Sequence, residues 1–163
     1  MASILGAIAK GTIAGVAGTA LMTAYQEAAA RARGGSAVAE SLKEPRTWAE
    51  APASARIAKK VSESVLGKRV TKRQAPLIGN VGSWSYGASL GAAYGLAASR
   101  VGTNPILQGL AFGTAAWGAA HAALTPLGLY DLPWRAPRSD LAVELSSHLV
   151  YGVGTAAVYE ALE

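Results

Sequence analysis

The sequence has no cysteine and little charge. Without cysteine among its 163 residues, the chain cannot form disulfides, use a thiol nucleophile or bind a metal through thiolates, and its redox compartment is left open. Charged residues make up 15% of the chain, against about 25% in soluble domains. With 51% hydrophobic residues, this deficit of charge is typical of a membrane protein.

Large aromatic side chains are also scarce. The chain has a single phenylalanine but 19 glycines and abundant alanine. Small side chains fill a large aqueous core poorly, but they let helices approach one another closely in lipid. The composition therefore favours small-residue helix packing inside a bilayer.

Four segments are long and apolar enough to be transmembrane helices, since crossing about 30 Å of hydrocarbon takes roughly 20 residues. They are residues 4–25, 77–99, 105–129 and 141–162. The first has no basic region before its apolar run and carries Lys10 inside it, so we interpret it as a span and not as a cleaved signal peptide. The prediction is an all-α polytopic membrane protein: a single domain, residues 1–163, forming a compact four-helix bundle.

Residues 26–76, between the first two spans, hold 11 of the 15 basic residues. Ile57, Ala58, Val61 and Val65 recur there at helical spacing before Gly67, which predicts a short amphipathic helix. Such a helix suits the anionic headgroups of a lipid bilayer. Because basic loops prefer the cytoplasmic side, we expect this loop inside a bacterial plasma (inner) membrane and both termini outside.

Glycines four residues apart recur in three of the predicted spans. Such rows allow close backbone contact between helices in lipid, either within one chain or in a homo-oligomer. The rows consist of Gly11 and Gly15, of Gly87, Gly91 and Gly95, and of Gly109 and Gly113.

Both histidines lie in predicted spans, where ionisable groups are costly and are functional candidates. His121 lies five residues before Pro126, and His148 lies eight residues after Asp140, which is about 7.5 and 12 Å of helix. In antiparallel neighbouring spans the two would have nearly the same depth. Glu144 shares a helix face with His148. The three side chains could fix helix register as a hydrogen-bonded network, carry protons or ions, or form a weak metal or haem site that lacks a further strong ligand.

A turn is predicted between the third and fourth spans. Its proline and glycine end or kink the third span, its aspartate and second proline make the turn, and its two aromatic residues suit the membrane interface. Ser139 or Asp140 is expected to cap the fourth helix. The turn residues are Pro126, Gly128, Tyr130, Asp131, Pro133 and Trp134.

No pattern indicates catalysis, a cofactor or a nucleic-acid partner. The run GASLGAAYG lacks the GK[ST] ending of a phosphate-binding loop, and no nucleophile, base and acid share a plausible geometry. The basic run GKRVTKRQ lies at the foot of a span, which favours lipid headgroups over DNA. We therefore expect a protein that is not an enzyme.

The motifs WGAAHAALTPLGLYDLPW and ELSSHLVYG, with a looser match in SYGASLGAAYG, resemble the YagU-like group of small bacterial inner-membrane proteins, which have four spans and no assigned activity. The resemblance covers roughly half the chain. It differs at Ser83, where members of the group tend to have a histidine, and this weakens a three-histidine metal site. The matching residues are His121, Pro126, Gly128, Trp134, Glu144, His148, Leu149 and Val150.

These observations predict a structural or interaction protein packed through its glycine rows. The first alternative is a proton, ion or small-solute path that uses the His/Glu cluster, and the second is a metal- or haem-binding membrane protein.

Overall fold

The computed structural model describes residues 3–65, 67–98, 104–130 and 132–163. It is helical, and these ranges contain no strand. The elements in chain order are α1 (Ile4–Ala32), α2 (Ala37–Ser41), α3 (Ala53–Val65), η1 (Lys72–Gln74), α4 (Ala75–Ala98), α5 (Pro105–Leu124), η2 (Pro133–Arg135) and α6 (Arg138–Ala161).

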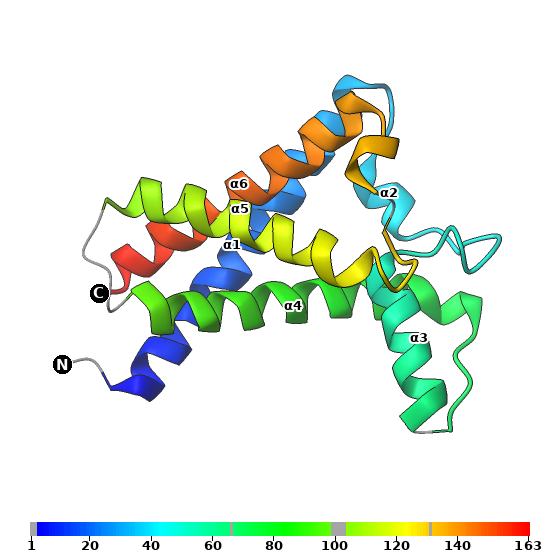
Figure 1. Ribbon diagram of the computed structural model, residues 1–163, viewed down its shortest axis with the longest axis horizontal. Helices are drawn as coiled ribbons and strands as arrows, with labels where there is room; N and C mark the ends of the chain where they lie inside the picture. The colour runs from blue at the N-terminus through cyan, green and yellow to red at the C-terminus, as the bar shows by residue number, and fades with distance from the viewer. Residues whose placement is uncertain (1–2, 66, 99–103, 131) are drawn as a thin grey trace.

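The four long helices form two crossed layers (Figure 1). α1 and α6 run antiparallel in one layer, and α4 and α5 cross them in the other. α4 packs on α1, α1 on α6 and α6 on α5, whereas α4 and α5 touch only slightly. The two termini lie at one end of the helices, opposite the end that carries α2 and α3.

The helix bounds differ from the predicted spans mainly in α1 and α5. α1 continues to Ala32, past residue 25. The residues after 25 are more polar, but none of them is a helix breaker, so the helix extends beyond the apolar segment. α5 stops at Leu124 because Pro126 has no N–H with which to continue the ladder. Gly128 then adopts φ +66°, and the N–H of Leu129 donates to the Leu124 carbonyl at 3.0 Å, which closes the helix end as a Schellman motif.

The predicted cap of the fourth helix is wrong. α6 begins at Arg138 after Pro137, and no side chain caps it. Asp140 lies in the first turn and accepts a hydrogen bond from Arg33, at the end of α1, at 3.0 Å. Because Asp140 lies in the first turn of α6, its negative charge interacts favourably with the positive end of the helix dipole.

The short helix expected in the first loop is present as α3. It extends crosswise from the loop end of α4 (Figure 1). Ala55 of α3 and Ala51 are buried against Ala75, with Trp48 packed on them. Ser54 donates to the Gly79 carbonyl of α4 at 2.9 Å. α3 therefore has a fixed place at the end of the helix layers.

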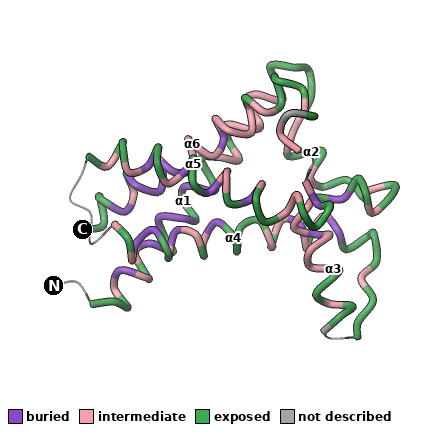
Figure 2. Tube along the Cα trace, viewed as in Figure 1, coloured by how far each residue is buried: buried purple, intermediate pink, exposed green. Residues whose placement is uncertain are grey.

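The interior is built from small residues and tyrosine. The largest fully buried side chains are Thr155 and Ser147, and Leu129 is the one large aliphatic residue buried in the described ranges. Large aliphatic side chains instead point outward, and Leu5, Leu77 and Ile106 are each at least 59% exposed. Figure 2 shows buried positions concentrated where the long helices cross. This distribution is the reverse of a water-soluble core.

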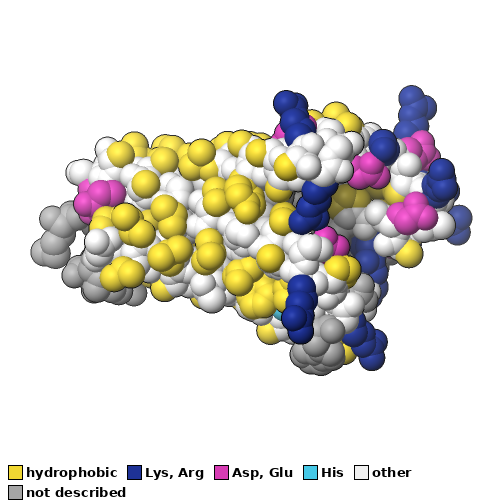
Figure 3. All heavy atoms as spheres, turned by 90° about the horizontal axis from the view of Figure 1, so that it is seen from above, with side chains coloured by type: hydrophobic (Ala, Val, Ile, Leu, Met, Phe, Trp, Pro, Cys, Tyr) yellow, Lys and Arg dark blue, Asp and Glu magenta, His cyan; other side chains and the backbone are white. Residues whose placement is uncertain are grey.

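Two described helices, α1 and α6, are long and apolar enough to cross a membrane. Four such helices were predicted, so composition supports membrane association without confirming four spans. α4 contains no charged residue, but five glycines, three serines and Asn80 dilute its hydropathy. Apolar side chains cover the long helices in Figure 3, and Lys and Arg gather towards the end that carries the loops.

Candidate functional site

The first glycine seam joins α1 and α4. A Cβ atom on Gly91 would lie 2.5 Å from Cα of Gly15, and one on Gly15 would lie 2.8 Å from Cα of Gly91. Gly95 meets the Gly11 backbone in the same way, and Gly87 meets the Thr19 side chain. Any side chain at the central positions would force the two backbones apart.

The second glycine seam joins α5 and α6. A Cβ atom on Gly109 would lie 2.6 Å from Cα of Val153, and one on Gly113 would lie 2.9 Å from the carbonyl carbon of His148. Gly152 completes this seam from the α6 side. The glycines of all three rows thus lie against other helices of the same chain, which favours packing within the monomer over self-association through these rows.

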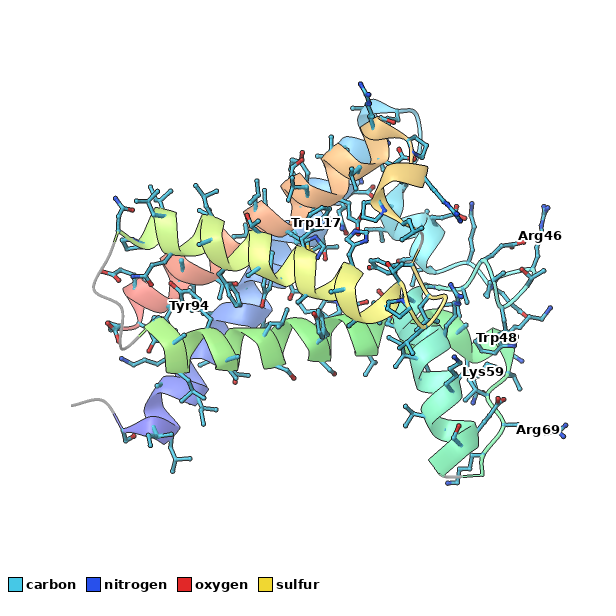
Figure 4. All side chains as sticks on the ribbon, viewed as in Figure 1. Arg46, Trp48, Lys59, Arg69, Tyr94 and Trp117 are labelled. Atoms are coloured by element: carbon cyan, nitrogen blue, oxygen red, sulfur yellow. The ribbon has the colours of Figure 1, made fainter. Side chains whose placement is uncertain are left out.

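An aromatic cluster lies between the long helices, in the half of the molecule nearer the two termini (Figure 4). The ring of Tyr94 lies 4.9 Å from that of Phe112 and 5.6 Å from that of Tyr159, between centroids, and Figure 4 shows Tyr94 between the long helices. Tyr151 and Tyr159 of α6 donate to the carbonyls of Gly87 and Gly95 at 2.7 and 3.2 Å. The cluster closes the interior at this depth, and the hydroxyls of its tyrosines are used in hydrogen bonds.

His121 and Glu144 form a contact between α5 and α6. Nε2 of His121 lies 3.3 Å from the carboxylate of Glu144. The histidine side chain is 11% exposed and the glutamate side chain 31%. Two of the three predicted cluster residues are therefore brought together, at the loop-side half of the α5–α6 pair.

His148 is not part of this contact. Its Nδ1 is hydrogen-bonded to the Glu144 backbone carbonyl of its own helix at 2.9 Å, and its backbone faces Gly113. The helix register places Glu144, one turn earlier, level with His121. The equal depth predicted for the two histidines is wrong, because it was counted from Pro126 and Asp140, which do not mark the ends of the facing helices. No three His, Asp or Glu side chains converge in the described ranges to hold a metal ion.

Two residues around His121, Trp117 and Thr125, were missed as site residues, and Tyr130 was predicted only as part of the turn. Trp117 and Tyr130 pack their rings on His121, with centroids 4.8 and 5.1 Å away, and Thr125 is the C-cap residue of α5, one turn after His121. Nε1 of Trp117, Nδ1 of His121 and Oγ1 of Thr125 are buried without a hydrogen-bond partner in the protein. The spacing of four residues between them could have revealed this row from sequence alone.

The predicted interfacial turn has several separate roles. Pro126 and Gly128 end α5, Tyr130 covers His121, and Pro133 starts η2. Asp131 lies outside the described residues, and Trp134 is described only by its backbone, within η2.

Arg56 connects α3 to the end of α5. Its guanidinium donates to the carbonyls of Gly128 and Leu129 at 2.7 and 3.2 Å. A cation suits these carbonyls because they lie at the negative end of the helix dipole. No sequence pattern predicted this contact, since the two elements are more than 70 residues apart.

A cavity of about 160 Å³ lies at the loop end of the first seam. Its hydroxyls and amide largely bond back to the chain: Thr23 donates to Thr19, Thr19 to Gly15, and Asn80 to Pro76 and Ser41. These groups have little need of a ligand. The lining residues are Thr19, Thr23, Gln26, Ala37, Val38, Ser41, Pro52, Gly79, Asn80, Ser83 and Trp84.

The loop end contains the molecule's ion pairs with lysine and arginine in the described ranges. Hydrogen bonds from the N–H of Val38 and the side chain of Arg31 hold the pKa of Glu27 at about 2, below the usual 4.5. The Lys59 ammonium lies 5.3 Å from the centroid of the Trp48 ring. Figure 4 shows these two side chains close together, with Arg46 and Arg69 extending outward.

No protein-family model, curated protein or solved structure matches the chain.

Proposed function

We propose that this chain is a single-domain, multi-pass protein of a bacterial inner membrane, and that it acts as a structural or interaction protein. The observation that carries the proposal is the reversed distribution of side chains, with aliphatic residues outside and alanine, glycine and tyrosine inside. Exposed aliphatic side chains would be unfavourable in water but are solvated by lipid.

Four spans fit this distribution better than two. α4 has 24 residues and α5 has 20, or about 36 and 30 Å of helix, and neither contains Asp, Glu, Lys or Arg. Leu77 and Val81 on α4, and Ile106 and Leu107 on α5, are exposed as lipid-facing side chains would be. With four spans, both termini lie on the side opposite the basic loop.

In this arrangement α3 lies along the membrane surface, because it runs crosswise to α4. Val61 is 51% exposed, on the helix face that it shares with Ser54 and Ile57. Lys60 and the basic residues after Gly67 are positioned to meet anionic headgroups. The bundle thus presents a basic platform on the cytoplasmic side.

A path through the monomer is the less favoured function. His121 and Glu144 lie in the loop-side half, and the aromatic cluster around Tyr94 fills the interior beyond them. This arrangement supports a role for the pair in setting helix register. The relation to the YagU-like group belongs to the same proposal and rests on the residue pattern alone.

Cysteine accessibility tests the membrane arrangement cleanly, because the chain has no cysteine of its own. Ser64→Cys and Glu163→Cys place single thiols on exposed residues at the two ends. A membrane-impermeant thiol reagent should modify Ser64→Cys in inside-out vesicles only, and Glu163→Cys in right-side-out vesicles only. Modification of both from the same side would contradict an even number of spans, and release of the protein by alkaline carbonate would contradict membrane integration altogether.

Lipid contact by α3 has its own test. An environment-sensitive dye on Val61→Cys should shift to the blue when the reconstituted protein moves from zwitterionic to anionic vesicles. The control is Glu63→Cys, on the opposite face of α3, where no shift is expected. Equal responses at the two positions would contradict the surface orientation.

A further inference from the structure

The described residues contain four buried side-chain polar atoms without a hydrogen-bond partner, and three of them form one row. Trp117, His121 and Thr125 follow each other at intervals of four residues along α5 and its C-cap, Thr125, so they share a helix face. A buried polar group that lacks a partner is unusual enough to require an explanation. Three in sequence indicate a common cause.

The row has not simply bonded back to its own helix. Thr114, on the same helix, donates to the Leu110 carbonyl at 2.8 Å, as helical threonines commonly do. The Thr125 hydroxyl does not bond to the His121 carbonyl, although that carbonyl, which accepts from the Thr125 N–H at 3.1 Å, has a second lone pair. The hydroxyl is left to find a partner outside the protein.

The hydrogen-bonding chemistry of the row selects its ligand. In the neutral imidazole whose Nε2–H donates to the Glu144 carboxylate, Nδ1 is an acceptor. Trp117 offers only a donor, and Thr125 offers both a donor and acceptors. An anion or a cation would satisfy one kind of group and oppose the other, whereas water satisfies both and typically makes about three hydrogen bonds when buried.

The position of the row indicates from which end of the molecule water would reach it. The Thr125 end reaches the turn after α5, where the ring of Tyr130 lies over His121 and Arg56 binds the turn carbonyls. Beyond Trp117 the aromatic cluster of Tyr94, Phe112 and Tyr151 fills the interior. Because Glu144, beside His121, is 31% exposed and the aromatic cluster lies at the other end of the row, the loop end is the nearer end to solvent.

We propose that Trp117, His121 and Thr125 bind internal water molecules that exchange past Tyr130 with solvent on the basic-loop side. The His121–Glu144 pair is then hydrated from one side of the membrane. This inference rests on the membrane arrangement proposed above, and its test separates the two.

Single cysteines can detect this water because thiol reagents attack the thiolate, whose formation an apolar environment suppresses. Thr125→Cys and His121→Cys probe the row. Ala123→Cys and Ala119→Cys are controls of similar depth, on exposed alanines of a different face of α5. In sealed inside-out vesicles we expect a small impermeant reagent to modify the row positions at least about tenfold faster than the controls, the ratio that one pKa unit of the thiol would give.

Each outcome identifies which proposal fails. If the row and the controls both resist modification, the water inference is wrong while the membrane arrangement stands. If the controls react as fast as the row, the membrane arrangement is wrong. Reaction of the row from the opposite side of the membrane would also overturn the inference.

A second measurement does not depend on cysteine. Thr125→Val replaces the hydroxyl with a methyl group of similar shape, and replacing an unsatisfied buried hydroxyl in this way stabilises a protein. If water satisfies Thr125, the midpoint of thermal unfolding should fall or stay unchanged, as it should in the control Thr114→Val. A clear rise in Thr125→Val alone would overturn the inference.

Discussion

The two glycine seams begin alike and end differently. Between α1 and α4 the row of Gly87, Gly91 and Gly95 keeps the backbones in contact over two helical turns. Between α5 and α6 the contact at Gly109 and Gly113 gives way, on the loop side, to the side chains around His121. Glycine thus determines where two helices touch by backbone, and a large polar side chain determines where they separate.

The difference explains why polar chemistry gathers in one seam. The three-glycine seam leaves space for one small side chain, that of Thr19 against Gly87, and its hydroxyl donates to the Gly15 carbonyl of its own helix at 2.8 Å. Where the glycines stop, Trp117 and His121 have room, and Glu144 of the facing helix contacts His121. A short glycine row therefore creates a site that a longer row would exclude.

The largest effect is expected from Gly91→Ala, which breaks the first seam. The added methyl group would overlap the Gly11 and Gly15 backbones, which cannot move as a side chain can. We expect a loss of about 3 kcal/mol in the free energy of unfolding, the upper range for overpacking. Reversible unfolding in detergent micelles measures it.

Gly118→Ala is the matched control on α5, since nothing lies within 4 Å of the position that its Cβ would take. We expect this variant to be neutral or slightly stabilising, because alanine favours helix. Equal destabilisation by both variants would show that helix propensity, and not contact between the backbones, decides the result.

A smaller effect is expected from Glu144→Ala in the polar half of the second seam. Removing the carboxylate leaves Nε2 of His121 without its partner, at a cost of about 1 kcal/mol. Glu144→Gln keeps an acceptor oxygen and should recover most of that loss. Unfolding in micelles again gives the comparison, and equal stability of the alanine variant and the natural chain would mean that the pair does not hold the helices in register.

The smallest effect lies outside both seams, in Glu27→Gln. The pKa of Glu27 is lowered from 4.5 to about 2 in the folded protein, so its charged form adds stability above pH 4.5 that is lost as the pH falls towards 2. The natural chain should unfold at a higher temperature than the variant at pH 7, and the gap should close between pH 4.5 and 2. A gap independent of pH would show that the charge of Glu27 is not the cause.

The sequence predicted the positions of the helices in the chain better than the contacts between them. The length of the apolar segments predicted the four long helices, and helical spacing predicted α3, because apolar runs, periodicity and helix breakers are local signals. The contact of His121 with Glu144 depends on the register of α5 against α6, which small residues set through three-dimensional fit. Arg56 reaching the α5 terminus, and the row from Trp117 to Thr125, depend on the same fit.

The order in which the helices pack has a consequence for biosynthesis. α1 and α4 can pair once both have been synthesised, but α5 packs chiefly on α6, which follows it in the chain. Tyr151 and Tyr159 then close the centre by bonding back to α4. α5 therefore lacks its main packing partner until α6 has been synthesised, and the second seam can form only after the helices of the first are complete.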